Sequence, residues 1–245
     1  MRSAIGAFVL SAATTIATAG GHFQTATSHR ILFVGNSLTA ANGLTKMVEA
    51  LARAGGDEVE IMTVAVNNFS LEDHWNSGEV RTAIARGNWT FVVLQQGPSA
   101  LPESQALLRD YAKRFSSEAQ KAGSRIALYM TWPPKTREAD FDAVSESYRL
   151  AARHVDGVLL PGGDAWRAAW RLDPSLQLYA EDGFHPSRLG SYVAALTIWR
   201  GLSGRTVIGL PGIDGVNPET IQLVQKAAEQ QFVSAPRRQE FAALR

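Results

Sequence analysis

The sequence predicts a three-layer α/β/α sandwich built on a five-stranded, parallel, doubly wound sheet. Short apolar segments that are typical of buried strands alternate along the chain with segments of helical periodicity. Strands separated by helices need crossover connections, which indicate a parallel sheet covered on both faces. Such crossovers are right-handed, so we expect helices on both sides of the sheet, as in the flavodoxin-like folds.

Five segments have the composition of strands, at residues 30–34, 58–66, 90–94, 125–130 and 157–160. The first is Arg-Ile-Leu-Phe-Val and ends at Gly35, where the chain can turn sharply. The third, residues 90–94, is apolar enough to be buried on both faces. A Trp-Pro-Pro sequence stops the fourth strand, because proline cannot continue a sheet ladder.

Helices are expected between and after these strands, at residues 43–54, 80–85, 103–121, 141–153, 187–202 and 217–232. The segment 103–121 shows the pattern most clearly, with Leu107, Leu108, Tyr111 and Phe115 on one side. We find no repeat, low-complexity tract or linker. The chain is therefore interpreted as one domain over residues 28–232, followed by a loose tail at 233–245.

Composition limits the partners and the chemistry. Hydrophobic residues make up 45% and charged residues 19% of the 245 residues, which is typical of a globular protein. The net charge is +1 and no basic stripe is present, so nucleic acid is not an expected partner. Cysteine is absent, which excludes disulfides, thiolate metal sites and a cysteine nucleophile, and is consistent with an oxidising compartment.

The N-terminal segment has the features of a signal peptide. A basic start at Met1 and Arg2 precedes an uncharged stretch of apolar or small residues that ends in Ala17-Thr18-Ala19. That stretch is short for a membrane span, which needs about 20 predominantly apolar residues, although an uncleaved anchor is the alternative. We therefore expect residues 1–19 to be removed and the protein to be secreted or periplasmic, without stable membrane insertion.

Ser37 lies just after the first predicted strand, where the functional sites of doubly wound sheets are found. Gly35 allows a close approach of the backbone to a ligand, and the N–H groups that follow can stabilise an anion. A serine here could attack a carbonyl group. The alternative is that Asn36 or Ser37 only caps a helix. The Gly-x-Ser-x-Gly elbow of α/β-hydrolases does not fit, because residue 39 is Thr.

A histidine and a carboxylate follow late in the chain, in Glu-Asp-Gly-Phe-His-Pro-Ser. In a turn that enters a helix, the spacing of Asp182 and His185 can bring the carboxylate to one ring nitrogen and leave the other free as a base. The alternative is a helix-entry turn with a surface histidine. The remaining histidines lie near the N-terminus, in a polar stretch or at a helix end: His22, His29, His74 and His154.

Together these two motifs resemble the SGNH (GDSL-like) hydrolase superfamily, over about residues 30–203. The resemblance implies that Ser37 is the nucleophile, that His185 is the base and that Asp182 orients it. The family usually has Asp before the serine, and here Asn36 stands in its place. No metal or cofactor is implied.

The family also forms an oxyanion hole from the serine N–H, a glycine N–H and an asparagine side chain, and here the sequence departs from the pattern. Residues 66–75 resemble a Gly-Gly-x-Ser-Leu-x-x-His-Trp stretch of a carbohydrate-esterase-like branch, with both glycines replaced by Asn. Asn tolerates left-handed backbone angles, so we expect the N–H of Asn68 to serve beside that of Ser37. Gln95 is the candidate for the missing amide and Gln96 the second choice. If neither side chain takes this place, the oxyanion hole is incomplete.

Three residues are expected to contact the substrate: Asn36, Gln96 and Trp132. Trp132 and Pro133 follow the fourth strand and are expected to line the rim, and His74 and Trp75 follow the loop after the second strand. Aromatic walls suit sugar rings, although such tryptophans can equally belong to the core.

The resulting hypothesis is an exported serine esterase that cleaves a small-molecule or saccharide ester, with an O-acetyl or other short acyl group, through an acyl-enzyme. An acyltransferase to glycan hydroxyls and a glycan-binding protein without turnover are the alternatives. A phosphate- or flavin-binding domain is less well supported, because the first loop has one glycine and no further phosphate-cradling residues. The sequence leaves the oligomeric state undetermined.

Overall fold

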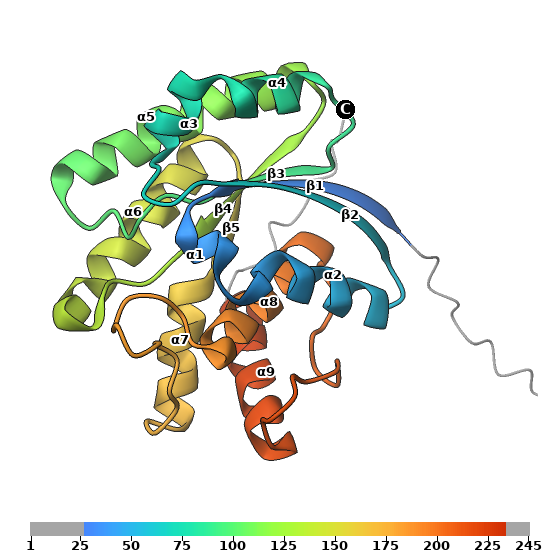
Figure 1. The fold of residues 1–245 in the computed structure, drawn as a ribbon, viewed down its shortest axis with the longest axis vertical. Coiled ribbons are helices and arrows are strands. Elements are labelled where there is room, and N and C mark those ends of the chain that lie inside the picture. The colour runs from blue at the N-terminus through green and yellow to red at the C-terminus, as the bar shows by residue number, and fades with distance from the viewer. Residues whose placement is uncertain (1–26, 234–245) are drawn as a thin grey trace, which may run out of the picture.

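The computed structural model describes residues 27–233, and these form a three-layer α/β/α sandwich (Figure 1). The sheet in this part of the chain is parallel, with the strand order β2-β1-β3-β4-β5. The strands are β1 (Ser28–Gly35), β2 (Glu58–Ala65), β3 (Phe91–Leu94), β4 (Arg125–Met130) and β5 (Val158–Pro161). The predicted fold class is confirmed, and each predicted strand end lies within two residues of the observed one. The predicted signal peptide and the tail beyond residue 233 lie outside the described residues.

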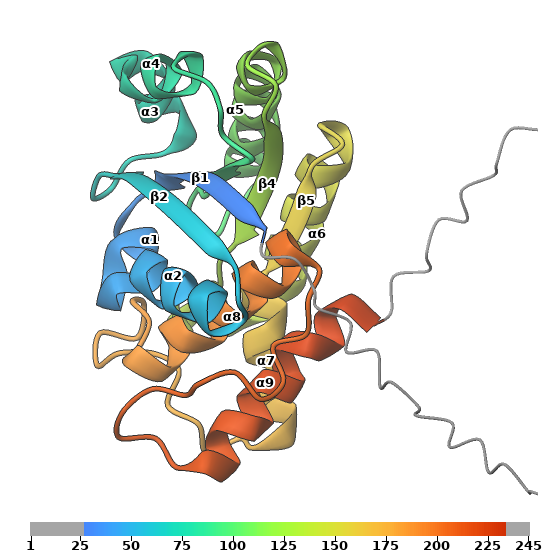
Figure 2. The same cartoon turned by 90° about the vertical axis from the view of Figure 1, so that its right-hand side faces the viewer.

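Helices cover both faces of the sheet (Figures 1 and 2). One face carries α3 (Leu71–Ser77), α4 (Glu79–Ala85), α5 (Pro102–Lys121) and α6 (Phe141–His154). The other carries α1 (Ser37–Ala40), α2 (Leu44–Ala54), α7 (Gly162–Leu172), α8 (Arg188–Ser203) and α9 (Pro218–Val233). Two short 3-10 helices, Ala41–Gly43 and Lys135–Asp140, complete the connections.

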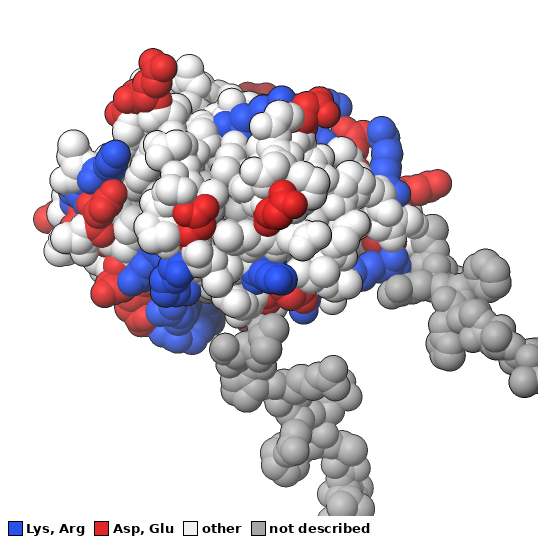
Figure 3. Space-filling view, turned by 90° about the horizontal axis from the view of Figure 1, so that it is seen from below, with Lys and Arg blue, Asp and Glu red and all other residues white. Residues whose placement is uncertain are grey.

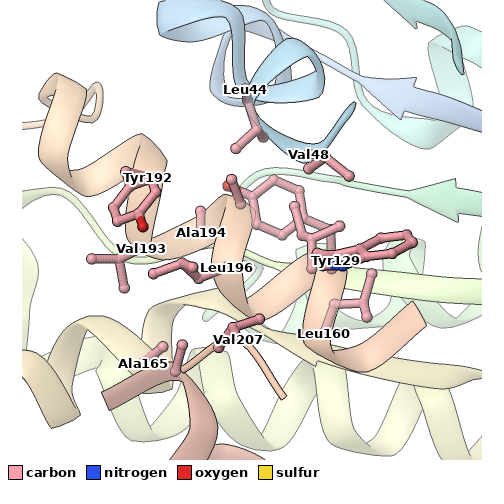
Figure 4. Packing of buried hydrophobic residues seen from close by; sticks show 14 of the residues in the cluster. Leu44, Val48, Tyr129, Leu160, Ala165, Tyr192, Val193, Ala194, Leu196 and Val207 are labelled. Carbon is pink, nitrogen blue, oxygen red and sulfur yellow. The ribbon is translucent and has the colours of Figure 1, made fainter. Parts of the chain in front are cut away.

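Successive side chains of the strands point alternately into two hydrophobic cores, one on each face of the sheet. On β1, Ile31 and Phe33 point into the core under α2 and α8, whereas Leu32 and Val34 point into the core under α4 and α5. Figure 4 shows the first core, where Tyr129 of β4 and Leu160 of β5 lie near side chains of α2 and α8. Burial on both faces explains why these strands are continuous apolar runs.

Helices α3 and α7 are absent from the sequence prediction. The sequence prediction has no helix between residues 160 and 187, yet Gly162 and Gly163 lie in the first turn of α7. A Cβ on Gly163 would lie 2.3 Å from the carbonyl oxygen of Thr131, so the helix can approach the end of β4 only without a side chain there. Helix α3 starts at a capping box in which the side chains of Ser70 and Asp73 accept from each other's backbone N–H groups. The surrounding residues are polar, so hydrophobic periodicity did not indicate this helix.

The strand order places a topological switch point between β1 and β3. The chain leaves β1 toward β2 and then crosses to β3 on the other side of β1, so the connections diverge at this position. In doubly wound sheets, ligands bind in the crevice outside the carboxyl ends of the strands at such a point. Ser37, two residues beyond the end of β1, is at this crevice.

Charged side chains are mixed on the face of the molecule seen from below, where acidic and basic groups lie among large uncharged areas (Figure 3). This face therefore presents no extended field of one sign. Within residues 27–233, no helix has both the length and the apolar character needed to cross a membrane.

Candidate active site

The loop after β1 holds Ser37 in a fixed orientation. Asn36 is the N-cap of α1, and its Oδ1 accepts a hydrogen bond of 3.1 Å from the N–H of Leu38. A Cβ at Gly35 would lie 2.3 Å from Thr39 Oγ1, so only glycine allows the turn to close this tightly. Ser37 is therefore the first residue of a capped turn at the sheet edge.

The side chains of Ser37, His185 and Asp182 form one hydrogen-bonded chain. The Ser37 hydroxyl lies 2.9 Å from Nε2 of His185, and Nδ1 of the same ring lies 2.6 Å from Oδ2 of Asp182. Because Nδ1 faces a carboxylate, it carries the ring proton, and Nε2 is left to accept the serine proton. The structure thus brings together three predicted residues that are separated by up to 148 positions in the chain.

Asp182 also organises the loop that carries His185. Its Oδ1 accepts hydrogen bonds of 2.9 Å from the backbone N–H groups of Phe184 and His185. The hydrogen bond from His185 and, next, that from the Phe184 N–H lower the pKa of Asp182 to about 2. The carboxylate is therefore charged at neutral pH and can stabilise a positive imidazolium.

Two side chains that lie far apart in the sequence fix the backbone on either side of His185. The indole Nε1 of Trp132 donates to the carbonyl of Phe184 at 3.0 Å, and Nδ2 of Asn42 donates to the carbonyl of Pro186 at 2.8 Å. The histidine is thus held from both neighbouring peptide units.

The prediction that Trp132 lines the rim is wrong. Its side chain is completely buried and stacks on Trp166 with 3.5 Å between ring centroids. An indole in that stack cannot reach a substrate, and it acts on the site only through the bond to Phe184. His74 is also buried, and its Nε2 donates to the Gly35 carbonyl at 2.8 Å beneath the serine loop.

Sequence reasoning missed Asn42. This residue has a left-handed backbone, with φ of 53°, and follows the short helix that begins at Ser37. The Ala-Asn-Gly sequence at this position is a signal for such a turn, because Asn and Gly tolerate positive φ. It gives no indication that the amide reaches Pro186, 144 positions later.

Within the described part of the chain, the backbone N–H groups of Ser37 and Asn68 have no acceptor. Asn68 has φ of 65°, which lies in the left-handed region. The tolerance of Asn for such angles was the reason to expect its N–H in the oxyanion hole. Nδ2 of Asn36 donates to the carbonyl of Phe69 at 3.0 Å, which ties the Asn68 loop to the serine loop. Both N–H groups are therefore available for the predicted oxyanion hole.

The side chain of Gln95 does not complete this hole, contrary to the prediction. It is fully buried, and its Oε1 accepts from the Asn36 N–H at 2.9 Å and from the Thr39 hydroxyl at 2.7 Å. Its Nε2 donates to the Gln96 carbonyl at 2.7 Å. Gln95 therefore braces the serine loop from inside and has no access to substrate.

The two remaining predicted contacts, Asn36 and Gln96, do lie in the wall of a cavity beside the triad. Both amides are already used, however. Nδ2 of Asn36 donates to Phe69, and Nε2 of Gln96 donates to Ser99 Oγ and to the Ser104 carbonyl, both at 3.1 Å. Gln96 Nε2 thus uses both of its hydrogens, whereas Asn36 Nδ2 makes one hydrogen bond and keeps its second N–H.

We expect Gln95→Leu to lower the free energy of unfolding by about 2–4 kcal/mol, because the Asn36 N–H and the Thr39 hydroxyl lose their buried acceptor. Urea denaturation would measure the change. The control is Gln177→Leu at an exposed glutamine, for which we expect a change within about 0.5 kcal/mol. A Gln95→Leu protein of unchanged stability but reduced kcat would instead identify Gln95 as an oxyanion donor.

Within residues 27–233, no group of three or more histidine, cysteine, aspartate or glutamate side chains is arranged to hold a metal ion. The arrangement of Ser37, His185 and Asp182 can activate a hydroxyl without one.

No protein-family model matches this chain, and no curated protein does either. Solved structures are similar to it. A DUF4886 family protein from Bacteroides uniformis has a TM-score of 0.72 at 18% identity, over 84% of this chain and 95% of that chain. A candidate SGNH hydrolase from Slackia heliotrinireducens has a TM-score of 0.61 at 29% identity, over 71% and 99% of the two chains. This chain has the SGNH hydrolase fold.

Other structures with the SGNH fold are described as esterases or lipases. A variant of an acetyl-xylooligosaccharide esterase from Geobacillus stearmophilus has a TM-score of 0.59 at 14% identity, over 73% of this chain and 95% of that one. The predicted resemblance to SGNH hydrolases is confirmed for the fold. The structure does not support the predicted third oxyanion donor, since Gln95 is an interior brace.

Proposed function

We propose that this chain is a serine esterase in which Ser37 is the nucleophile, His185 the base and Asp182 the residue that orients the base. The observation that supports this proposal is the continuous hydrogen-bonded chain of 2.9 and 2.6 Å through the two nitrogens of one imidazole. Nucleophile, base and orienting group at these distances are the signature of an activated serine.

Acylation follows from this geometry. The Ser37 hydroxyl transfers its proton to Nε2 of His185 while its oxygen bonds to the ester carbonyl carbon. The negative charge on the carbonyl oxygen faces the N–H groups of Ser37 and Asn68. The imidazolium then gives its proton to the alkoxide oxygen as the bond to the acyl carbon breaks, which releases the alcohol and leaves an ester on Ser37.

Deacylation repeats these steps with water. His185 takes a proton from a water molecule, whose oxygen attacks the acyl carbon, and returns that proton to the Ser37 oxygen as the acid leaves. The side chains of His185 and Asp182 are 38% and 51% exposed, so water reaches the site in the absence of substrate. A sugar hydroxyl in place of water would give transfer, and product analysis distinguishes the two reactions.

We also propose that the enzyme acts outside the cytoplasm. The basic start and the Ala-Thr-Ala sequence support this, together with the absence of cysteine. N-terminal sequencing of the exported protein would test it, and a first residue near position 20 is the expected result.

Covalent labelling tests the assignment of the nucleophile. A 4-nitrophenyl alkyl phosphonate should release one equivalent of 4-nitrophenol and add one phosphonyl group to the peptide that contains Ser37, as measured by mass spectrometry. Labelling of the Ser37→Ala protein to the same extent would reject the assignment. Prior incubation of the wild type with a slowly turned-over ester should protect Ser37, because both reagents need the same oxygen.

A further inference from the structure

A cavity of about 450 Å³ adjoins the triad: its wall includes Asn36, which precedes Ser37, and Phe184, which precedes His185. Asn68 also lines it. Cavities of about 300–1,000 Å³ are the size that holds a whole small ligand, so this one is larger than an acetyl group needs.

The wall of the cavity is mainly apolar. It includes Phe69, Pro98, Leu101, Leu107, Pro133 and Phe184. Leu101 is 52% exposed and leaves apolar surface in water at the edge of the cavity. Covering this surface with an apolar group would be favourable.

Most polar side chains of the wall already bond to the protein, with Asn68 as the exception. The pairs are Ser70 Oγ with Asp73, Ser99 Oγ with the Gly97 carbonyl, Ser104 Oγ with the Leu101 carbonyl, and Arg137 with Asp140. The amides of Asn36 and Gln96 are engaged in the same way. Sugar hydroxyls each need a partner when they are buried, and this wall leaves few side chains free to provide one.

The direction of the reaction indicates which half of the ester faces the cavity. The alcohol oxygen must leave beside Nε2 of His185, which protonates it. Phe184 comes from the loop that carries His185, and the wall residues between 133 and 140 come from the segment after β4, which bonds to that loop through the Lys135 N–H and the Gly183 carbonyl at 2.8 Å. The larger part of the wall, which includes Asn68 and Leu101, comes from the segments after β1, β2 and β3 rather than from the His185 loop. The acyl group, which stays on Ser37 when the alcohol leaves, therefore points toward the cavity.

We propose that this cavity binds the acyl chain of the substrate and that the preferred ester carries an unbranched apolar acyl chain several methylenes longer than acetyl. The inference rests on the proposed esterase function. The expectation of an O-acetyl or other short acyl group was based on sequence resemblance, and this proposal is based on the chemistry of the wall.

The test is a series of 4-nitrophenyl esters from acetyl to decanoyl, measured below their critical micelle concentrations. We expect kcat/KM to rise about fourfold for each methylene that enters the cavity, which is about 0.8 kcal/mol, or roughly two-hundredfold from acetyl to hexanoyl. A parallel series of acetate esters with lengthening alcohols should stay nearly flat. A profile that falls from acetyl onward, or a rise in the alcohol series alone, would overturn the proposal.

Leu101→Asn provides the site-specific variant. Leu101 is the N-cap of α5 and makes no side-chain cap bond, and Asn is a preferred N-cap residue, so the fold should be preserved. We expect kcat/KM to fall about tenfold for the octanoyl ester and less than about twofold for the acetyl ester. The matched control is Leu172→Asn, at a leucine that is 46% exposed and lies outside the cavity wall, which should leave both values unchanged.

The two experiments distinguish a failure of the acyl-site proposal from a failure of the proposed esterase function. An enzyme that hydrolyses 4-nitrophenyl acetate through Ser37 but shows no chain-length preference, or the same preference in Leu101→Asn, retains the esterase assignment and loses the acyl site. A protein that hydrolyses no ester in either series loses the esterase assignment itself and, with it, the acyl site that rests on it.

Discussion

Ser37→Ala is expected to lower kcat for ester hydrolysis by about 10⁴–10⁶-fold, the loss seen when the nucleophile of a serine triad is removed. The reason is that the Ser37 hydroxyl, 2.9 Å from Nε2 of His185, supplies the oxygen that bonds to the acyl carbon. The rate of 4-nitrophenol release from the best ester of the chain-length series would measure the effect.

The control for this substitution is Ser117→Ala, on an exposed side of α5 where the hydroxyl bonds only to the carbonyl of Lys113. Its kcat should equal that of the wild type. Urea midpoints of the three proteins should agree closely, because Ser37 is a partly exposed residue at the start of a short helix. Retention of more than about a hundredth of the activity in folded Ser37→Ala would assign the chemistry to another group.

The triad could be predicted from sequence because each part of it is a local signal. A buried strand that ends in Gly-Asn-Ser places a hydroxyl at the carboxyl edge of the sheet, and Asp182 reaches His185 within one turn of chain. The rule that sites lie at this edge of a parallel sheet then joins the two segments, although the spacing alone does not.

The supporting groups could not be predicted, because their roles depend on contacts between distant segments. Gln95 directly follows a buried strand, as a catalytic residue would, and only its contacts with Asn36 and Thr39 identify it as a brace. Trp132 follows a strand end like a rim residue, yet the ring of Trp166 covers it. A polar or aromatic residue at a strand end therefore predicts proximity to the site but not access to it.

Asp182→Asn is expected to reduce kcat by about 10³–10⁴-fold with little change in structure. The carboxamide oxygen can still accept from the N–H groups of Phe184 and His185, as Oδ1 does now, so the loop should keep its shape. The amide nitrogen, however, would replace Oδ2 and donate to Nδ1 of His185. The ring proton would then move to Nε2, which could no longer accept the proton of Ser37.

Asp173→Asn is the matched control, because it changes an aspartate in the same connection between α7 and α8 that also organises a turn. Oδ1 of Asp173 accepts from the N–H and the hydroxyl of Ser175, and these hydrogen bonds lower its pKa as well, but no imidazole depends on it. Its kcat should stay within about twofold of the wild type.

Equal losses in the two variants would mean that Asp182 acts by holding the loop rather than by fixing the tautomer of His185. A loss confined to Asp182→Asn, with an unchanged urea midpoint, would show that the charge and orientation at this one ring nitrogen determine whether Ser37 can react.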